Sequence, residues 1–152
     1  MKTKIILLSF SLFLVAGIGF AQKKKDSKDQ PKSIIRKGTS IKKYHNIDEL
    51  EQMQKGELVD LYIERIETLV NVLPYIGFAI KPGVTMETLG IPTNKDNKEA
   101  LEEQFENTDN YLENTVEFQK MILPYSDTSK LISAILFYEE AMKLLHEYGE
   151  YR

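Results

Sequence analysis

The chain has 152 residues, a formal net charge of −3 and no cysteine. The absence of cysteine excludes disulfide bonds, cysteine-based catalysis and a lipid anchor on a mature N-terminal cysteine. The length suits one domain with a modest core, and the absence of Trp together with only eight Gly favours a helical chain over a β-rich one.

Residues 1–21 have the layout of a secretory signal peptide. Lys2 and Lys4 precede an apolar run over residues 5–20, and Ala21 is the small residue expected before a cleavage site. The rival interpretation is an uncleaved membrane anchor, but this run is shorter than the roughly 17–25 residues that a spanning helix needs. We therefore expect export and cleavage after Ala21.

Positive charge is concentrated in residues 22–43, which hold nine basic and two acidic residues, whereas residues 44–152 hold nine basic and 21 acidic ones. High charge and low hydrophobicity predict a basic disordered arm, and a solvated spacer is the plainest interpretation. The arm would otherwise contact an anionic membrane surface or fold back on the acidic body. Nucleic acid is not expected, because no aromatic residues alternate with the basic ones. The residues assigned to an anionic contact are Lys23, Lys24, Lys25, Arg36, Lys37, Lys42 and Lys43.

The body begins with two predicted helices. Asn46 is a typical N-cap followed by acidic residues, which the helix dipole favours in a first turn, and Gly56 is expected to interrupt this short helix. Apolar residues spaced by three and four over residues 58–73 predict a long helix, which Pro74 ends or kinks.

Residues 75–94 are apolar but irregular, with a turn at Pro82-Gly83. We expect Thr85 to cap a single helical turn that Gly90 ends in the left-handed conformation. A connection of about twenty residues is long for a compact domain, and long ordered loops often carry function. The candidate binding residues in this connection are Tyr75, Phe78, Ile80 and Val84. Tyr125, at the end of a later helix, is a fifth candidate.

Two further helices complete the prediction. One starts at residue 93 or 94 and ends at residue 123, because apolar positions oppose a Glu-rich face. The last is capped by Ser126 or Asp127, ends at Gly149 and carries the most apolar stripe of the chain, which predicts that it lies at the centre of the core. We predict an all-α fold, a small helical bundle of three main helices and one or two short ones over residues 44–152.

Two segments of the body resemble each other. Residues 62–75 and 111–125 both begin Tyr-aliphatic-Glu and end Leu-Pro-Tyr. They are either a trace of a duplicated helix-turn unit or two helices that end in the same way at the same end of the bundle. Both alternatives predict Pro74 and Pro124 at equivalent ends of two core helices.

No residue pattern predicts catalysis. A di-iron bundle needs Glu-x-x-His on two helices, but Lys143 stands three residues before His146, and His45 precedes the first helix. Calcium loops, phosphate-binding motifs and a Gly-x-Ser-x-Gly turn are missing. We expect no catalytic residue, no metal and no cofactor. The least favoured alternative is an enzyme that uses His146 with nearby carboxylates.

The sequence has the layout of an export signal but no recognisable catalytic or metal-binding motif. We therefore predict a non-enzymatic interaction or adaptor protein of a bacterial cell envelope. We expect an accessory subunit of a membrane-associated complex with a protein partner, in the periplasm or peripherally associated with the outer or inner membrane. The alternative is a periplasmic helical bundle that binds a small ligand between its helices and residues 75–94, with Phe78, Ile80 and Val84 lining the pocket.

Overall fold

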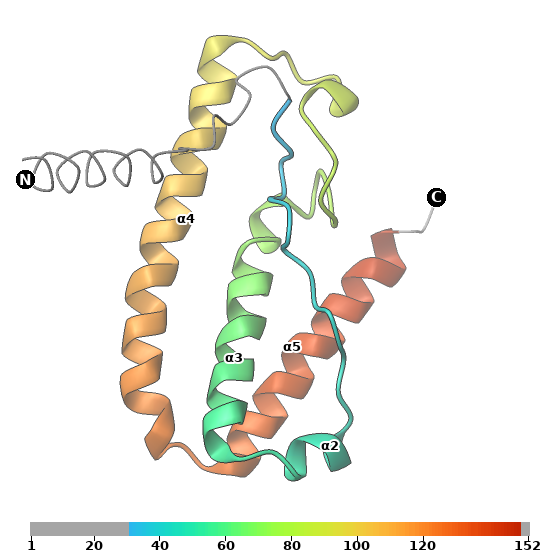
Figure 1. Ribbon diagram of the computed structural model, residues 1–152. Coiled ribbons are helices and arrows are strands. Elements are labelled where there is room, and N and C mark those ends of the chain that lie inside the picture. Colours follow the sequence, from blue (N-terminus) through green and yellow to red (C-terminus); the bar gives the residue numbers. More distant parts are fainter. Residues whose placement is uncertain (1–30, 150–152) are drawn as a thin grey trace, which may run out of the picture. The chain divides into compact units, whose positions relative to one another are not determined.

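The computed structural model describes residues 31–149. Three long helices carry the fold of this range, and an isolated bridge between Ser33 and Thr85 is its only β-type pairing (Figure 1). The prediction of an all-α fold with three main helices is confirmed, whereas the signal peptide and residues 22–30 lie outside the described range. In chain order the elements are α2 (Ile47–Glu51), α3 (Lys55–Val70), η1 (Leu73–Tyr75), η2 (Glu87–Leu89), α4 (Lys95–Ile122), η3 (Leu123–Tyr125) and α5 (Thr128–Gly149), where η marks a 3-10 turn.

Local capping explains where the helices begin. The Asn46 side chain accepts a hydrogen bond from the Glu49 amide, and the Glu49 carboxylate accepts one from the Asn46 amide, which makes a capping box on α2. The side chain of Asn94 caps α4 in the same manner by accepting from the Asn97 amide at 2.9 Å. Gly90 adopts a φ of 71° and ends η2, as the sequence predicts.

One predicted boundary is wrong. Gly56 does not interrupt a helix but lies in the first turn of α3. The Glu57 carboxylate accepts a hydrogen bond from the Gln54 amide at 2.7 Å and thereby fixes the start of α3 before the glycine. The entropic cost of glycine is greatest in the middle of a helix, so glycine is tolerated in this first turn.

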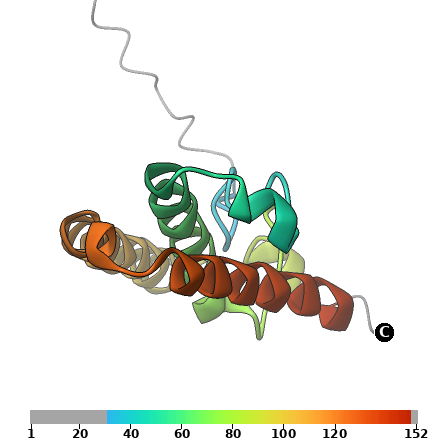
Figure 2. The same ribbon diagram turned by 90° about the horizontal axis from the view of Figure 1, so that it is seen from below.

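Helix α3 contacts both other long helices, and it packs most extensively on α5 (Figures 1 and 2). The structure bears out the predicted central place of α5 and shows that α3 shares it. Buried residues of α5 enter both apolar clusters of the core, as Met142 does in the first and Ile135 in the second, but α3 also contributes to both. None of the described helices combines the length and the apolar character needed to cross a bilayer.

Residues 31–45, which we call the strap, are packed against the helices. Ile34 and Ile35 are 4% and 0% exposed, and the Ile34 amide donates to the Val84 carbonyl oxygen at 2.8 Å. This corrects the disordered arm expected over residues 22–43, because its part from residue 31 onward belongs to the folded unit. Two adjacent isoleucines supply the burial, and acidic groups of α4 pair with Lys32 and Arg36. Residues 31–43 therefore match the alternative in which the arm folds back on the acidic body.

The two Leu-Pro-Tyr sequences both form a 3-10 turn directly after a long helix. Pro74 and Pro124 therefore follow the C-terminal ends of α3 and α4. These helices run in opposite directions, so the two turns lie at opposite ends of the helix pair (Figure 1). The expectation that both would lie at the same end of the bundle is wrong.

Candidate functional site

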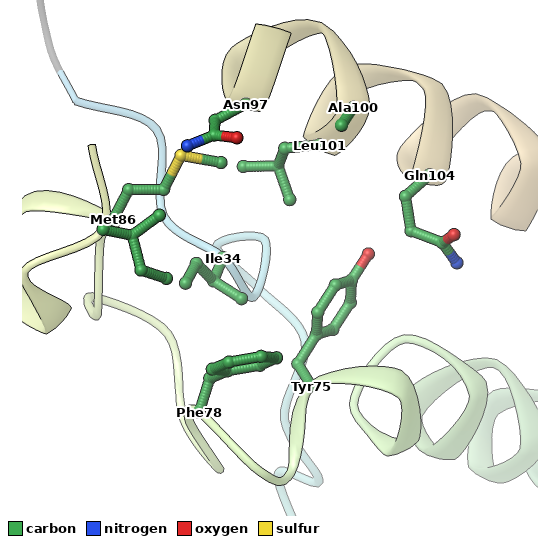
Figure 3. Close-up of a pocket in the computed structure, with 9 residues that line it drawn as sticks. Ile34, Tyr75, Phe78, Met86, Asn97, Ala100, Leu101 and Gln104 are labelled. Atoms are coloured by element: carbon green, nitrogen blue, oxygen red, sulfur yellow. The ribbon is translucent and has the colours of Figure 1, made fainter. Parts of the chain in front are cut away.

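An apolar pocket of about 270 Å³ opens between the strap, the connection from η1 to η2 and the first turns of α4 (Figure 3). Tyr75 and Phe78, both predicted from the sequence, lie in its wall. Ile80 and Val84, which the sequence also predicted as binding residues, do not line this pocket. The remaining lining residues are Ile34, Met86, Ile91, Asn97, Ala100, Leu101 and Gln104.

Ile80 and Val84 contribute to packing instead. The Ile80 side chain occupies the space that a Cβ at Gly149 would need, which explains why the end of α5 carries a glycine. Val84 packs on the first core cluster, and its carbonyl oxygen accepts hydrogen bonds from the strap. The connection between η1 and η2 thus packs against α5 through Ile80 and against the strap through Val84. Only part of this connection faces the pocket.

Tyr75 is the most buried of the polar residues in the pocket wall, which also includes Asn97 and Gln104. The residue is 7% exposed, its ring meets the edge of Phe105 at a centroid distance of 6.1 Å, and its hydroxyl has no hydrogen-bond partner among the described residues. The nearby Thr108 hydroxyl donates its own proton to the Gln104 carbonyl at 2.8 Å. Burial raises the pKa of Tyr75, and the positive charge of Arg36 opposes this shift. In Figure 3 the Tyr75 ring reaches from η1 toward α4 between Leu101 and Gln104.

Arg36 connects the strap to the wall behind Tyr75. Its guanidinium makes two hydrogen bonds to the Asp109 carboxylate, at 2.6 and 2.8 Å, and one to Asn71 at 2.8 Å. It also stacks over Phe105 at 5.1 Å from the ring centroid. The hydrogen bond to Arg36 lowers the pKa of Asp109 and raises that of Arg36 itself. The Arg36 charge is therefore paired with Asp109 in a partly exposed position.

The other basic residues assigned to an anionic surface are placed differently. Lys37, Lys42 and Lys43 are exposed, and Lys43 pairs with Glu49 at 2.9 Å. Lys23, Lys24 and Lys25 lie outside the described residues. An anionic contact of residues 22–43 stays a prediction.

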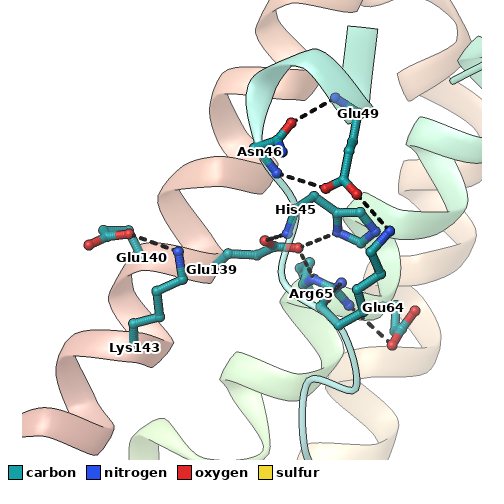
Figure 4. Close-up of polar contacts among 9 residues, drawn as sticks. His45, Asn46, Glu49, Glu64, Arg65, Glu139, Glu140 and Lys143 are labelled. Atoms are coloured by element: carbon teal, nitrogen blue, oxygen red, sulfur yellow. Dashed lines mark hydrogen bonds and ion pairs between the residues drawn. The ribbon is translucent and has the colours of Figure 1, made fainter. Parts of the chain in front are cut away.

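A buried ionic cluster joins the strap to α3 and α5 (Figure 4). Glu139 is 1% exposed and Arg65 is 2% exposed, and the Arg65 Nε donates to Glu139 Oε1 at 2.8 Å. The His45 amide donates to Glu139 Oε2 at 2.6 Å, while His45 Nδ1 lies 2.9 Å from Oε1. Burial by itself raises the pKa of Glu139, but the hydrogen bonds from His45 and Arg65 outweigh it and leave the pKa lowered.

Sequence reasoning missed this cluster, although its signal is visible. Glu139 stands between Ile135 and Met142 at helical spacing, inside the apolar stripe of α5. A carboxylate in such a position must find a buried cation, which Arg65 provides. Because the Glu139 oxygens accept hydrogen bonds from His45 and Arg65, the cluster ties the strap to α3 and α5.

An exposed apolar stripe, which we call the α4 stripe, runs along the C-terminal half of α4 into η3. Its members are separated by seven, four and three residues and therefore share one side of the helix. They are Tyr111, Phe118, Ile122 and Tyr125, with exposures of 55%, 61%, 46% and 86%. The predicted residue Tyr125 is thus placed apart from Tyr75 and Phe78.

Tyrosines of α3 and α5 lie near the first member of the α4 stripe. Tyr111 lies near Tyr138 of α5, whose hydroxyl donates to that of Tyr62 at 3.1 Å. Burial, followed by these two tyrosines, raises the pKa of Tyr138. The exposed carboxylates Glu106, Glu113 and Glu117 lie on a different side of α4, because the helical period places them well around the helix from Tyr111 and Phe118. The helix as a whole is nevertheless acidic, and an acidic helix with exposed apolar groups fits a partner with apolar and basic ones.

His146 lies half-buried on α5 and does not line the pocket. Among residues 31–149, no three His, Asp or Glu side chains gather in a group that could hold a metal ion. In comparisons with known proteins, the chain matches no family model, no curated protein and no solved structure. The candidate sites therefore rest on the geometry of this chain.

Proposed function

We propose that the protein is an exported, non-enzymatic interaction protein of a bacterial cell envelope that binds a protein partner through the α4 stripe. The observation that carries this proposal is the row of exposed apolar side chains over α4 and η3. Scattered exposed apolar residues are ordinary, whereas aligned ones mark interaction surfaces. Three of the four members are aromatic, the class of residue that dominates binding energy at protein interfaces.

The partner chemistry follows from the net negative charge of the helix that carries this stripe. Helix α4 carries eight acidic and three basic residues over Lys95–Ile122. An amphipathic segment with apolar anchors and Lys or Arg on its flank would match this surface. The net negative charge of α4 would steer its approach, so association should slow as salt is added.

Export is supported by the layout of residues 1–21, which precedes the folded unit. Fractionation of the native host and N-terminal sequencing of the exported chain test this part. Cleavage after Ala21 agrees with the proposal, and recovery of an uncleaved chain in the cytoplasm contradicts it.

The docking surface is tested by photo-crosslinking in the native envelope. A photoreactive benzoylphenylalanine at Phe118 or Tyr125 should give one dominant protein adduct. The same residue at Ile47, which is 52% exposed on α2, is the matched control and should give none. Adducts of equal intensity at all three positions, or none at Phe118, would overturn the assignment of the α4 stripe.

A variant measurement makes the test quantitative. Phe118→Ser removes a central aromatic anchor and should weaken binding of the crosslinked partner at least about tenfold, the scale of an interface hot spot. Ile47→Ser should leave the affinity unchanged. Both variants should keep the helical circular dichroism signal, because both side chains are exposed.

A further inference from the structure

We propose that the outer side of α5 pairs with the same side of a second copy of this chain, as an antiparallel pair of helices. Helix α5 contacts α3 and α2, and both lie on one side of it in Figure 2. By the helical period, the opposite side presents Phe137, Leu144 and Tyr148, which are 66%, 42% and 72% exposed. None of these residues belongs to the α4 stripe, so failure of one proposal leaves the other standing.

The first argument is the spacing of this outer row. Apolar residues at positions 137, 141, 144 and 148 are separated by four, three and four residues, which is the alternation of the two seam positions in a heptad repeat. Continued toward the start of α5, the same alternation reaches positions 134 and 130. A row with this spacing packs along a second helix, because it stays between two helices that wind around each other. We call these six residues the α5 seam: Lys130, Ala134, Phe137, Ala141, Leu144 and Tyr148.

The second argument is the order of large and small residues along the α5 seam. In an antiparallel pair, residues at one seam position face residues at the other seam position of the partner helix. When Phe137 faces the partner's Ala141, Leu144 faces the partner's Ala134 in the same register. Each large apolar side chain thus meets a small one, so the two helices can approach closely. The two-fold axis repeats both contacts, as in an isologous interface.

The third argument is the distribution of charge. The same register places Lys130 beside the partner's Glu147 and Tyr148, and all three side chains are exposed. A carboxylate and a tyrosine ring both attract the ammonium group. Glu140 lies next to the two-fold axis and meets its own copy, but Lys143 pairs with it at 3.3 Å and reduces the repulsion. A parallel pair would instead bring Lys130 beside the partner's Lys130, so the charges select the antiparallel orientation.

Sedimentation equilibrium of the exported chain, purified from its host, tests the association. A single pair of helices is a small interface, so we expect a reversible dimer with a dissociation constant in the micromolar range. Measurements from roughly 1 µM to 1 mM cover that range on both sides. A chain that stays monomeric over all of these concentrations, or that associates beyond a dimer, would overturn the proposal.

Two serine variants locate the interface. Phe137→Ser removes the large side chain nearest the axis and should weaken dimerisation at least about tenfold, the scale of an interface hot spot. Phe118→Ser of the α4 stripe is the matched control, because Phe118 is 61% exposed and Phe137 is 66% exposed. It should dimerise as the parent does, and both variants should keep the helical circular dichroism signal. Equal effects of the two variants would remove the α5 seam from the interface.

Charge reversal tests the register. Lys130→Glu and Glu147→Lys should each weaken the dimer about threefold, the scale of a surface ion pair. The variant that carries both changes restores opposite charges at each end and should recover the affinity of the parent. A double variant that dimerises no better than the single ones would overturn the pairing of Lys130 with Glu147.

Cross-linking tests the orientation. The chain has no cysteine, so an introduced one is the sole thiol of each variant. Ser133→Cys and Glu147→Cys change two exposed positions that face each other across the antiparallel pair. A mixture of the two variants, treated with a short bismaleimide, should give mainly the mixed cross-linked dimer. Products that join mainly identical variants would overturn the antiparallel arrangement.

Discussion

The turns η1 and η3 have the same sequence, Leu-Pro-Tyr, and the same 3-10 backbone, yet they bury opposite side chains. In η1, Tyr75 is 7% exposed and Leu73 is 44% exposed. In η3, Tyr125 is 86% exposed, whereas Leu123 packs on the second core cluster. A local sequence can therefore set the conformation of a turn without deciding which of its residues enters the core.

The surroundings explain the difference. After η1 the chain continues into the connection to α4, and the strap and Phe105 close over Tyr75. After η3 the chain enters α5 within three residues, so nothing covers the outer side of the turn. Leu123 instead faces α3, which η3 contacts.

The largest expected effect comes from truncating the two tyrosines. Tyr75→Ala should lower the free energy of unfolding by about 3 kcal/mol, because a buried ring is replaced by a cavity. Tyr125→Ala should change it by no more than ~0.5 kcal/mol, as an exposed position does. Chemical denaturation of both variants measures the difference, and equal losses would show that the two turns are equivalent after all.

The leucines should show the reverse order. Leu123→Ala is expected to cost about 1–2 kcal/mol, roughly half of the loss for a fully buried leucine, because Leu123 is only partly buried. Leu73→Ala should cost less than ~0.5 kcal/mol. The same denaturation experiment applies, and a larger loss for Leu73 would contradict the placement of η3 against α3.

A smaller effect comes from the ion pair behind Tyr75, which has no counterpart at Tyr125. Asp109→Asn should lower the free energy of unfolding by about 0.5–1 kcal/mol, since the pair is partly exposed. The pKa of Asp109 is lowered by Arg36, so this contribution is present above the ordinary pKa of 3.8 and is lost as pH falls through the folded value. In the variant, the difference from the parent should vanish in acid, and a difference that persists there would contradict this cause.

The smallest effect is confined to alkaline solution. Burial raises the pKa of Tyr75 above its ordinary value of 10.0. Its neutral form is therefore favoured by folding, so the contribution to stability is complete below pH 10.0 and declines as pH rises through the folded pKa. Ultraviolet titration of the parent and of Tyr75→Phe should differ by one late transition, and a difference at or below pH 10.0 would contradict the burial of Tyr75.

Much of the local structure could be read from the sequence. Asn46 and Asn94 start helices, and Gly90 ends a turn, because capping and left-handed conformations depend on the residue itself. The strap was misread because the nine basic residues of segment 22–43, which includes most of the strap, concealed Ile34 and Ile35. Average charge describes a segment, whereas burial is decided by two side chains and the partners that they meet.

The candidate sites were only partly predictable. The irregular connection pointed to Tyr75 and Phe78, since a long apolar loop needs something to pack against. The α4 stripe escaped notice because a helical period shows which residues share a side, but not which side a neighbouring helix covers. The cluster of Arg65 and Glu139 required two helices whose pairing no local pattern reveals.

By itself, the sequence of this protein determined the number of long helices, their approximate ends and the two Leu-Pro-Tyr turns, because these depend on interactions among near neighbours in the chain. Only the tertiary structure decided that the strap joins the fold, that Tyr75 is buried while Tyr125 is exposed, and that a pocket opens beside α4. Those outcomes depend on contacts between residues far apart in the chain. The free energy of such contacts is set by what each side chain meets in space.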